Sequence, residues 1–87
     1  MEFEYDPRKS ESNKIKHDID FEEAKVLWSD PRGYEIEVAA KGESRHVLIA
    51  YHRMRHWTAV FTYREERIRI ISVRRARVKE IGLYDNR

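Results

Sequence analysis

The chain has 87 residues, of which 18 are Lys or Arg and 16 are Asp or Glu, and its formal net charge is +2. This length predicts a single domain spanning residues 1–87, near the lower limit for one hydrophobic core. The absence of cysteine excludes disulfide bonds and thiolate chemistry. With no signal-peptide pattern and no run of about 20 apolar residues, we expect a cytoplasmic protein without a membrane segment.

The N-terminal region is predicted to form a short edge strand and a polar helix. Residues 3–5 alternate between apolar and acidic side chains, which is typical of a strand. Asp6 followed by Pro7 is typical of a helix start, since Asp caps and proline tolerates the first helical position. The helix should run to about His17. Ile15 is almost its only apolar residue, so burial of an apolar face is not expected to hold it.

A second helix is predicted to begin after Asp20. Asp20 and Glu23 have the spacing of a capping box, in which each side chain accepts a hydrogen bond from the other residue's backbone N–H. The helix should end near Trp28. Its buried side is expected to consist of Phe21, Ala24, Val26, Leu27 and Trp28. Turns are expected at residues 29–33 and at Gly42.

Four strands and a short helix are expected in the rest of the chain. The strands should cover residues 34–39, 46–51, 57–63 and 67–73, and the helix residues 76–84. If the last two strands form a hairpin, Tyr63 faces Ile68 and Phe61 faces Ile70. Their core side should carry Trp57, Phe61, Tyr63, Ile68 and Ile70. The opposite, open face should carry Thr58, Val60, Thr62, Arg64, Arg67, Arg69, Ile71, Val73 and, by parity, Arg75.

Positive charge is concentrated around this hairpin. Residues 1–44 hold seven Lys or Arg and twelve Asp or Glu, whereas residues 45–87 hold eleven and four, which gives net charges of −5 and +7. Six arginines lie between Tyr63 and Arg77. Arginine binds phosphate through a planar fork of donors, so the pattern indicates a polyanionic partner such as nucleic acid. The structural alternative is a solvated face rich in ion pairs.

Three runs of residues resemble the BrnT family of bacterial toxins: FEYDPRKSESNKIKHDIDFEEA, the SDP turn that follows it, and YREERIRIISVRRARVKEIGLY. Two positions depart from the family pattern. Asp18 stands where a glycine normally follows the Lys-His pair, and Arg77 stands where a small hydroxyl residue often starts the last helix. These departures bear on the conformation after His17 and on the cap of the last helix.

The resemblance implies an α+β fold of the RelE/ParE type, with two N-terminal helices and a short C-terminal helix packed on one face of a small antiparallel sheet. It also implies a ribonuclease that arrests translation and is neutralised by a BrnA-like antitoxin in a hetero-oligomer. Enzymes of this kind need no metal or other cofactor. The ribose 2′-hydroxyl attacks the adjacent phosphate, so the protein must accept one proton, stabilise the phosphorane and supply another proton.

The candidate site residues follow from the open face and from the resemblance. The candidate catalytic residues are Arg64, Arg69 and Arg75 for the phosphorane charge, and His17 and Tyr84 for proton transfer. The candidate RNA-binding residues are Lys9, Lys16, Arg67, Arg74 and Arg77. Structural alternatives exist: His17 could bind the carbonyls at the end of its helix, and Tyr84 could pack on the sheet. The stripe formed by Lys9, Asn13 and Lys16 could be an RNA track or solvated surface. Glu80 could orient an arginine or act as a base, or it could form a helix-surface ion pair.

Other functions remain compatible with the sequence. The same arginines would serve a non-catalytic RNA- or DNA-binding module. A degenerate toxin could keep the fold and act only as a co-repressor with its antitoxin. The related ParE toxins act on gyrase, so the fold alone does not determine the target. His46, His52 and His56 lack metal-ligand spacing, and no metal site is expected.

Overall fold

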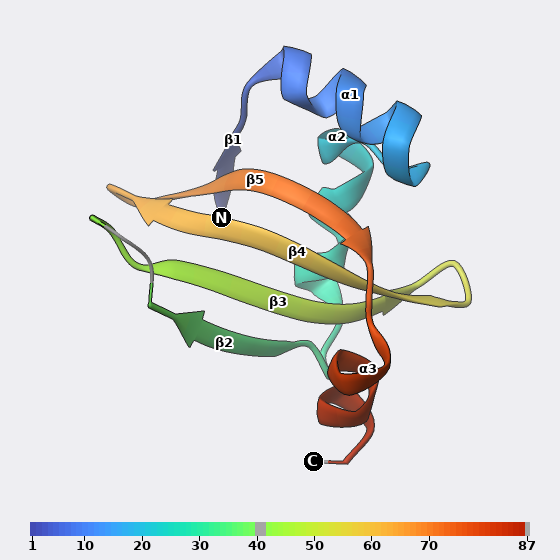
Figure 1. Cartoon of the computed structure of the whole chain (residues 1–87). Coiled ribbons are helices and arrows are strands. Elements are labelled where there is room, and N and C mark those ends of the chain that lie inside the picture. The colour runs from blue at the N-terminus through green and yellow to red at the C-terminus, as the bar shows by residue number, and fades with distance from the viewer. Residues whose placement is uncertain (40–41, 87) are drawn as a thin grey trace.

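The computed structural model describes residues 1–39 and 42–86, which form an α+β fold (Figure 1). These residues contain a five-stranded sheet in the order β1-β5-β4-β3-β2. The strands are β1 (Glu2–Glu4), β2 (Tyr34–Val38), β3 (Arg45–His52), β4 (Arg55–Arg64) and β5 (Arg67–Arg75). The helices are α1 (Pro7–His17), α2 (Phe21–Ala24), the 3₁₀ helix η1 (Lys25–Ser29) and α3 (Val78–Asp85). The second helix predicted from the sequence is thus a short α-helix continued by a 3₁₀ helix.

The sheet is mixed and larger than expected. β1 pairs with β5 in parallel, with Glu4 opposite Arg69, whereas the other strand pairs are antiparallel. The expectation of a small antiparallel sheet is therefore wrong at this edge. The reason is that the N-terminal strand adds to the outer edge of β5, which the hairpin leaves unpaired.

Helices cover both faces of the sheet. The main core lies between the sheet and the segment from Ile19 to Leu27, and Figure 1 shows the segment that continues α2 passing behind the strands. Its buried members are Ile19, Phe21, Ala24, Leu27, Leu48, Ala50, Trp57, Ala59, Phe61, Ile68, Ile70 and Val73. α3 lies on the other face, where the Thr58 hydroxyl donates to Glu80 at 2.9 Å. The expectation that all helices pack on one face is therefore wrong.

Polar contacts rather than an apolar face hold α1 in place. Its N-cap is Asp6, which accepts from the N–H of Arg8, and Pro7 is the first helical residue, as predicted. Ile15 is exposed, whereas Ser10 and Asn13 are buried. The Asn13 side chain accepts from the N–H of Val73 and donates to its carbonyl, at 3.1 and 2.8 Å. β1 pairs with β5 only at residues 67–69, and the Asn13 side-chain amide makes the hydrogen bonds to β5 further along, at Val73.

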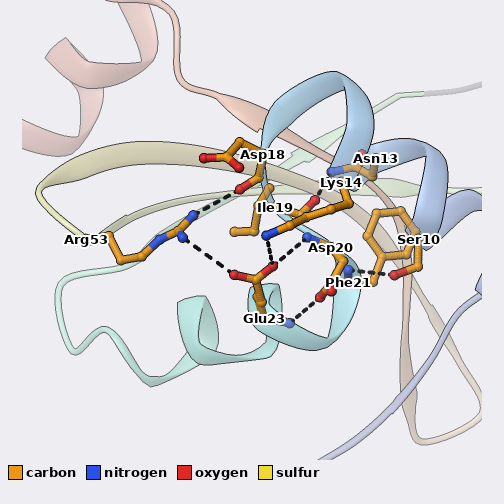
Figure 2. Close-up of polar contacts among 9 residues, drawn as sticks. All are labelled: Ser10, Asn13, Lys14, Asp18, Ile19, Asp20, Phe21, Glu23 and Arg53. Carbon is orange, nitrogen blue, oxygen red and sulfur yellow. Dashed lines mark hydrogen bonds and ion pairs between the residues drawn. The ribbon is translucent and has the colours of Figure 1, made fainter.

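The corner between α1 and α2 is built from caps and ion pairs (Figure 2). Asp18 adopts the left-handed conformation with φ of 63°, and its N–H donates to the Lys14 carbonyl, so it ends α1 where glycine is usual. The capping box of Asp20 and Glu23 is present as predicted. Arg53, at the tip of the β3–β4 hairpin, reaches the Asp18 carbonyl at 3.2 Å and Glu23 at 3.5 Å. The departure at Asp18 therefore leaves the helix end intact.

A β-bulge in the hairpin of β4 and β5 changes the predicted side-chain pattern. The expected pairs of Tyr63 with Ile68 and Phe61 with Ile70 are present, but a shift between Val60 and Phe61 makes Ile71 an extra residue on β5. Beyond the bulge, Val73 faces the core and is fully buried, and it is Arg74 that shares the face of Thr58. The assignments of Val73 and Arg75 to the open face are therefore wrong.

Val26 on η1 is 42% exposed, so its expected burial is wrong, because the 3₁₀ helix turns this side chain to solvent. No helix within residues 1–39 and 42–86 is long and apolar enough to cross a membrane.

Candidate active site on the open sheet face

The open face, defined as the sheet face opposite α1 and α2, has a basic end and a covered end. Strand pairing places Arg64 and Thr62 of β4 beside Arg67 and Arg69 of β5. Further along β4, α3 covers Thr58, which is fully buried. The end near Arg64 is left accessible, since the side chains of Arg64 and Arg67 are 53% and 50% exposed.

Three arginines surround one carboxylate at the accessible end, and we call Arg64, Arg67 and Arg69 the arginine cluster. Glu4 of β1 accepts from Arg69 at 2.8 Å and lies 3.8 Å from both Arg64 and Arg67. Glu2 lies 3.7 Å from Arg67. The cluster thus has a structural role in fastening β1, and a phosphate bound there must share its donors with Glu4. Its geometry also shows that these side chains can hold one anion between them.

Arg74 forms a second, more enclosed charge site beside α3. It donates to both carboxylate oxygens of Glu80, at 2.8 and 2.9 Å. Thr58 and the N–H of Arg77 also donate to Glu80. The Arg74 hydrogen bonds, with smaller contributions from the Arg77 N–H and Thr58, lower the pKa of Glu80 from its ordinary 4.5 to about 2. Glu80 also caps α3 through the Arg77 N–H, so the helix starts well without a hydroxyl residue.

The two charge sites cannot act on the same phosphate. Arg69 and Arg74 are five residues apart on β5, which corresponds to roughly 15 Å of extended strand. Arg75, which we expected to act with Arg64 and Arg69, is exposed on the opposite side of the strand end. The structure therefore brings together Arg64, Arg67 and Arg69 and separates them from Arg74 and Arg75.

The expected proton-transfer residues lie far from the arginine cluster and from each other in the fold. His17 is half-buried at the end of α1, on the side of the main core. Tyr84 is buried on α3, and its hydroxyl donates to Asp30 at 2.7 Å. Lys9 and Lys16 are exposed on α1, whereas Asn13 of the same stripe is buried and serves the structure. These positions place no side chain of α1 on the open face.

His56 is a titratable group on the open face that the sequence analysis considered only as a metal ligand. Its ring makes edge contacts with the rings of Tyr51 and Tyr84, at 4.9 and 5.1 Å between centroids. Its Nε2 lies 3.6 Å from Asp85. The two-residue turn at Arg53 and Met54 places His56 opposite Tyr51. Such turns usually contain glycine or asparagine, and neither occurs here, so the sequence contains no clear signal for this pairing. Within the described part of the chain, no three His, Asp or Glu side chains are placed to share a metal ion.

Comparison with known families identifies the chain's relatives. Residues 5–80 match a family described as "Ribonuclease toxin, BrnT, of type II toxin-antitoxin system". The chain belongs to the BrnT family. The matched segment runs from Tyr5, just before α1, into the first turn of α3, so it includes the arginine cluster and Glu80 but not Glu4 or Tyr84. A search of the curated proteins found no match.

Membership gives the arginine cluster a functional context. BrnT proteins are ribonuclease toxins, and type II systems pair the toxin with an antitoxin. Sequence reasoning located Arg64, Arg67 and Arg69 on one face but missed Glu4 among them. The available signal was the alternation of residues 3–5, because a strand with Phe3 in the core must place Glu4 on the opposite face.

Proposed function

We propose that this BrnT protein is an active endoribonuclease that cuts RNA without a metal ion and thereby arrests translation. The arginine cluster carries the proposal. Three guanidinium groups on two paired strands lie within 3.8 Å of one carboxylate, at the accessible end of the open face. A site that holds one anion in this way fits a backbone phosphate, and arginine donors on rigid strands suit a phosphorane.

The chemistry follows from what RNA offers. The 2′-hydroxyl attacks the adjacent phosphorus, the bond to the 5′-oxygen breaks, and the products end in a cyclic phosphate and a 5′-hydroxyl. Arg64 and Arg69 contact non-bridging oxygens, where negative charge increases in the transition state. Arg67, which is exposed at the rim, contacts a neighbouring phosphate. Lys9, Lys16 and Arg77 are exposed and available for weaker contacts with the RNA backbone.

Neutralisation requires a partner that covers the open face. We propose a BrnA-like antitoxin whose acidic, amphipathic segment lies across the arginine cluster and excludes RNA. A groove of about 290 Å³ beside α3 extends this surface, with Ile36, Val38, Val47 and Leu83 as its apolar lining and Arg77 and Lys79 at its rim. Apolar side chains of the segment would enter the groove while its carboxylates face the arginines.

Expression in a bacterial host tests the function. We expect the chain alone to stop growth and to yield RNA fragments ending in cyclic phosphate, and co-expression of the small protein encoded beside it to restore growth. Cleavage by the purified protein should persist in EDTA. Growth arrest with intact RNA would indicate a target such as gyrase. Normal growth with a well-folded protein would indicate a degenerate toxin.

A further inference from the structure

One carboxylate lies within reach of every member of the arginine cluster. Glu4 Oε2 is 2.8 Å from Arg69 Nη1 and 3.8 Å from Arg64 Nη1, and Glu4 Oε1 is 3.8 Å from Arg67 Nη1. The Glu4 side chain is 24% exposed, so a ligand can reach it. Glu4 and Arg69 are direct partners on neighbouring strands, which fixes their relative position. A phosphate bound by these guanidinium groups therefore lies beside a carboxylate.

Other titratable groups are poorly placed to act on that phosphate. His17 ends α1 on the side of the main core, and the Tyr84 hydroxyl donates to Asp30 beside α3. Glu80 is held by both terminal nitrogens of Arg74 at the covered end of the face. Glu2 contacts Arg67 at 3.7 Å but is 80% exposed at the rim. Glu4 alone among these groups combines contact with Arg64 and Arg69, the pair assigned to the scissile phosphate, with access to a ligand.

We propose that the Glu4 carboxylate is the general base that takes the proton from the RNA 2′-hydroxyl. The proposal rests on the ribonuclease function proposed above and adds a catalytic residue to it. As the proton moves to Glu4, the 2′-oxygen forms a bond to phosphorus. The bond from phosphorus to the 5′-oxygen breaks, and the leaving oxygen takes a proton from water. Glu4 then returns its proton to solvent.

The charge balance of the cluster favours this arrangement. Before reaction, three guanidinium groups face two single negative charges, one on Glu4 and one on the phosphodiester. In the transition state Glu4 becomes neutral and the phosphorane becomes doubly negative. The total charge facing the arginines is unchanged. One negative charge moves from Glu4 to the neighbouring phosphorane, and the guanidinium donors for it are already in place. The arginines that hold Glu4 in the free protein thus become available to the phosphorane as the carboxylate is neutralised.

Glu4→Gln separates catalysis from binding. Two probes are needed: an RNA oligonucleotide that the wild-type protein cuts, and the same oligonucleotide with 2′-deoxyribose, which cannot react. We expect the single-turnover cleavage rate to fall by about 100-fold or more, the contribution typical of a general base. Binding of the deoxy probe should stay the same or tighten, because a negative charge next to the arginines is removed.

Glu2→Gln is the matched control, since it removes the same charge from the same strand and face. It should leave the cleavage rate unchanged and tighten binding of the deoxy probe slightly. If Glu4→Gln behaves like Glu2→Gln, Glu4 only neutralises the arginines and the proposal is overturned. Equal losses of binding and cleavage with a lower melting temperature would assign Glu4 a structural role and would overturn it too. A wild-type protein that cleaves no RNA would instead refute the ribonuclease function itself.

Glu4→Asp covers the case in which Glu4→Gln does not fold. It keeps the negative charge beside the arginines but withdraws the carboxylate by one methylene. We expect binding of the deoxy probe at the wild-type level and cleavage at least about 10-fold slower, since a displacement near 1 Å strongly slows proton transfer. Cleavage by Glu4→Asp at the wild-type rate would overturn the proposal.

Discussion

At the scale of single residues, the structure assigns separate tasks to side chains that look alike in the sequence. Arg69 and Arg74 both lie on β5 and both contact a glutamate. Arg69 makes one 2.8 Å contact with Glu4 at the accessible end of the open face. Arg74 gives both terminal nitrogens to Glu80, and only 23% of its side chain is exposed. Arg69 therefore has donors to offer a ligand, whereas Arg74 is committed to α3.

Arg69→Ala should reduce RNA cleavage strongly while the protein stays folded. Removal of a preorganised donor typically costs about 3 kcal/mol of transition-state stabilisation, which is roughly 100-fold in rate. Arg69→Lys should restore only part of the activity, because an ammonium group lacks the planar fork. Single-turnover cleavage assays measure both effects, with Arg8→Ala on the exposed start of α1 as the control. A folded Arg69→Ala protein that cleaves at the parent rate would remove Arg69 from the site.

Asn13 is a residue whose role is structural, although it lies in a stripe that we considered for RNA binding. Its amide makes hydrogen bonds with Val73 N–H, Val73 C=O and the Ile19 carbonyl. Asn13→Ala should lower the free energy of unfolding by about 2–4 kcal/mol, because these buried backbone groups lose their partner. Urea denaturation measures the change, and Ser12→Ala at an exposed neighbouring position is the control. A loss no larger than that of the control would show that water replaces the amide.

At the scale of elements, local sequence signals predicted the helix caps and the hairpin pairing correctly. They did not predict contacts between residues far apart in the sequence. The caps at Asp6 and Asp20 and the pairing of Tyr63 with Ile68 depend on neighbours in sequence, and all three are confirmed. The bulge at Ile71 was not predictable, because the apolar run around it fits either register.

The candidate site shows the same division. The face carrying Arg64, Arg67 and Arg69 followed from strand alternation and is confirmed. The contact of Glu4 with Arg69 joins residues 65 positions apart, and the alternation of residues 3–5 indicates the face of Glu4 but not the strand beside it. The side of the sheet chosen by α3 likewise depends on where Thr58 meets Glu80. Contacts between residues far apart in the sequence thus decide which arginine side chains a ligand can reach.

The attachment of α3 should depend on pH through Glu80. Its pKa is lowered from 4.5 to about 2, so the ionised carboxylate stabilises the fold above pH 4.5, and this contribution is lost as the pH falls toward 2. The shift corresponds to roughly 3 kcal/mol. Glu80→Gln should therefore be less stable than the wild type at pH 7, by an amount that shrinks between pH 4.5 and 2. Urea denaturation across this range provides the test, with Glu11→Gln on α1 as control. A difference that does not change with pH would contradict the role of the charge.

At the scale of the whole molecule, the open face joins a basic region to an apolar one. The arginine cluster lies at one end, and the groove lined by Val38 and Leu83 lies between β2, β3 and α3. Leu83 and Val38 are 45% and 39% exposed, and Arg77 and Lys79 flank them. An acidic segment with apolar side chains complements both regions, whereas RNA complements the basic region alone.

Leu83→Asp should therefore weaken antitoxin binding without abolishing RNA cleavage. A carboxylate in the apolar groove removes an apolar contact and repels an acidic segment, and an effect of about 2 kcal/mol or more on binding is expected. Calorimetric titration with the cognate antitoxin measures the effect. Ile15→Asp makes the same kind of change at an exposed position of α1 and is the control. If Ile15→Asp weakens binding and Leu83→Asp does not, the antitoxin docks on α1.

The parallel pairing of β1 with β5 sets the order in which this protein can be completed during its own synthesis. Glu2–Glu4 are made before their partners at residues 67–69, which follow 65 positions later in the sequence. The same delay applies to Asn13, whose partner Val73 lies 60 residues later. Closing such long loops is an entropic cost that can be offset only after β5 has been made. Before β5 is made, a nascent chain thus has neither its completed sheet nor Glu4 among the arginines, and the proposed site cannot form.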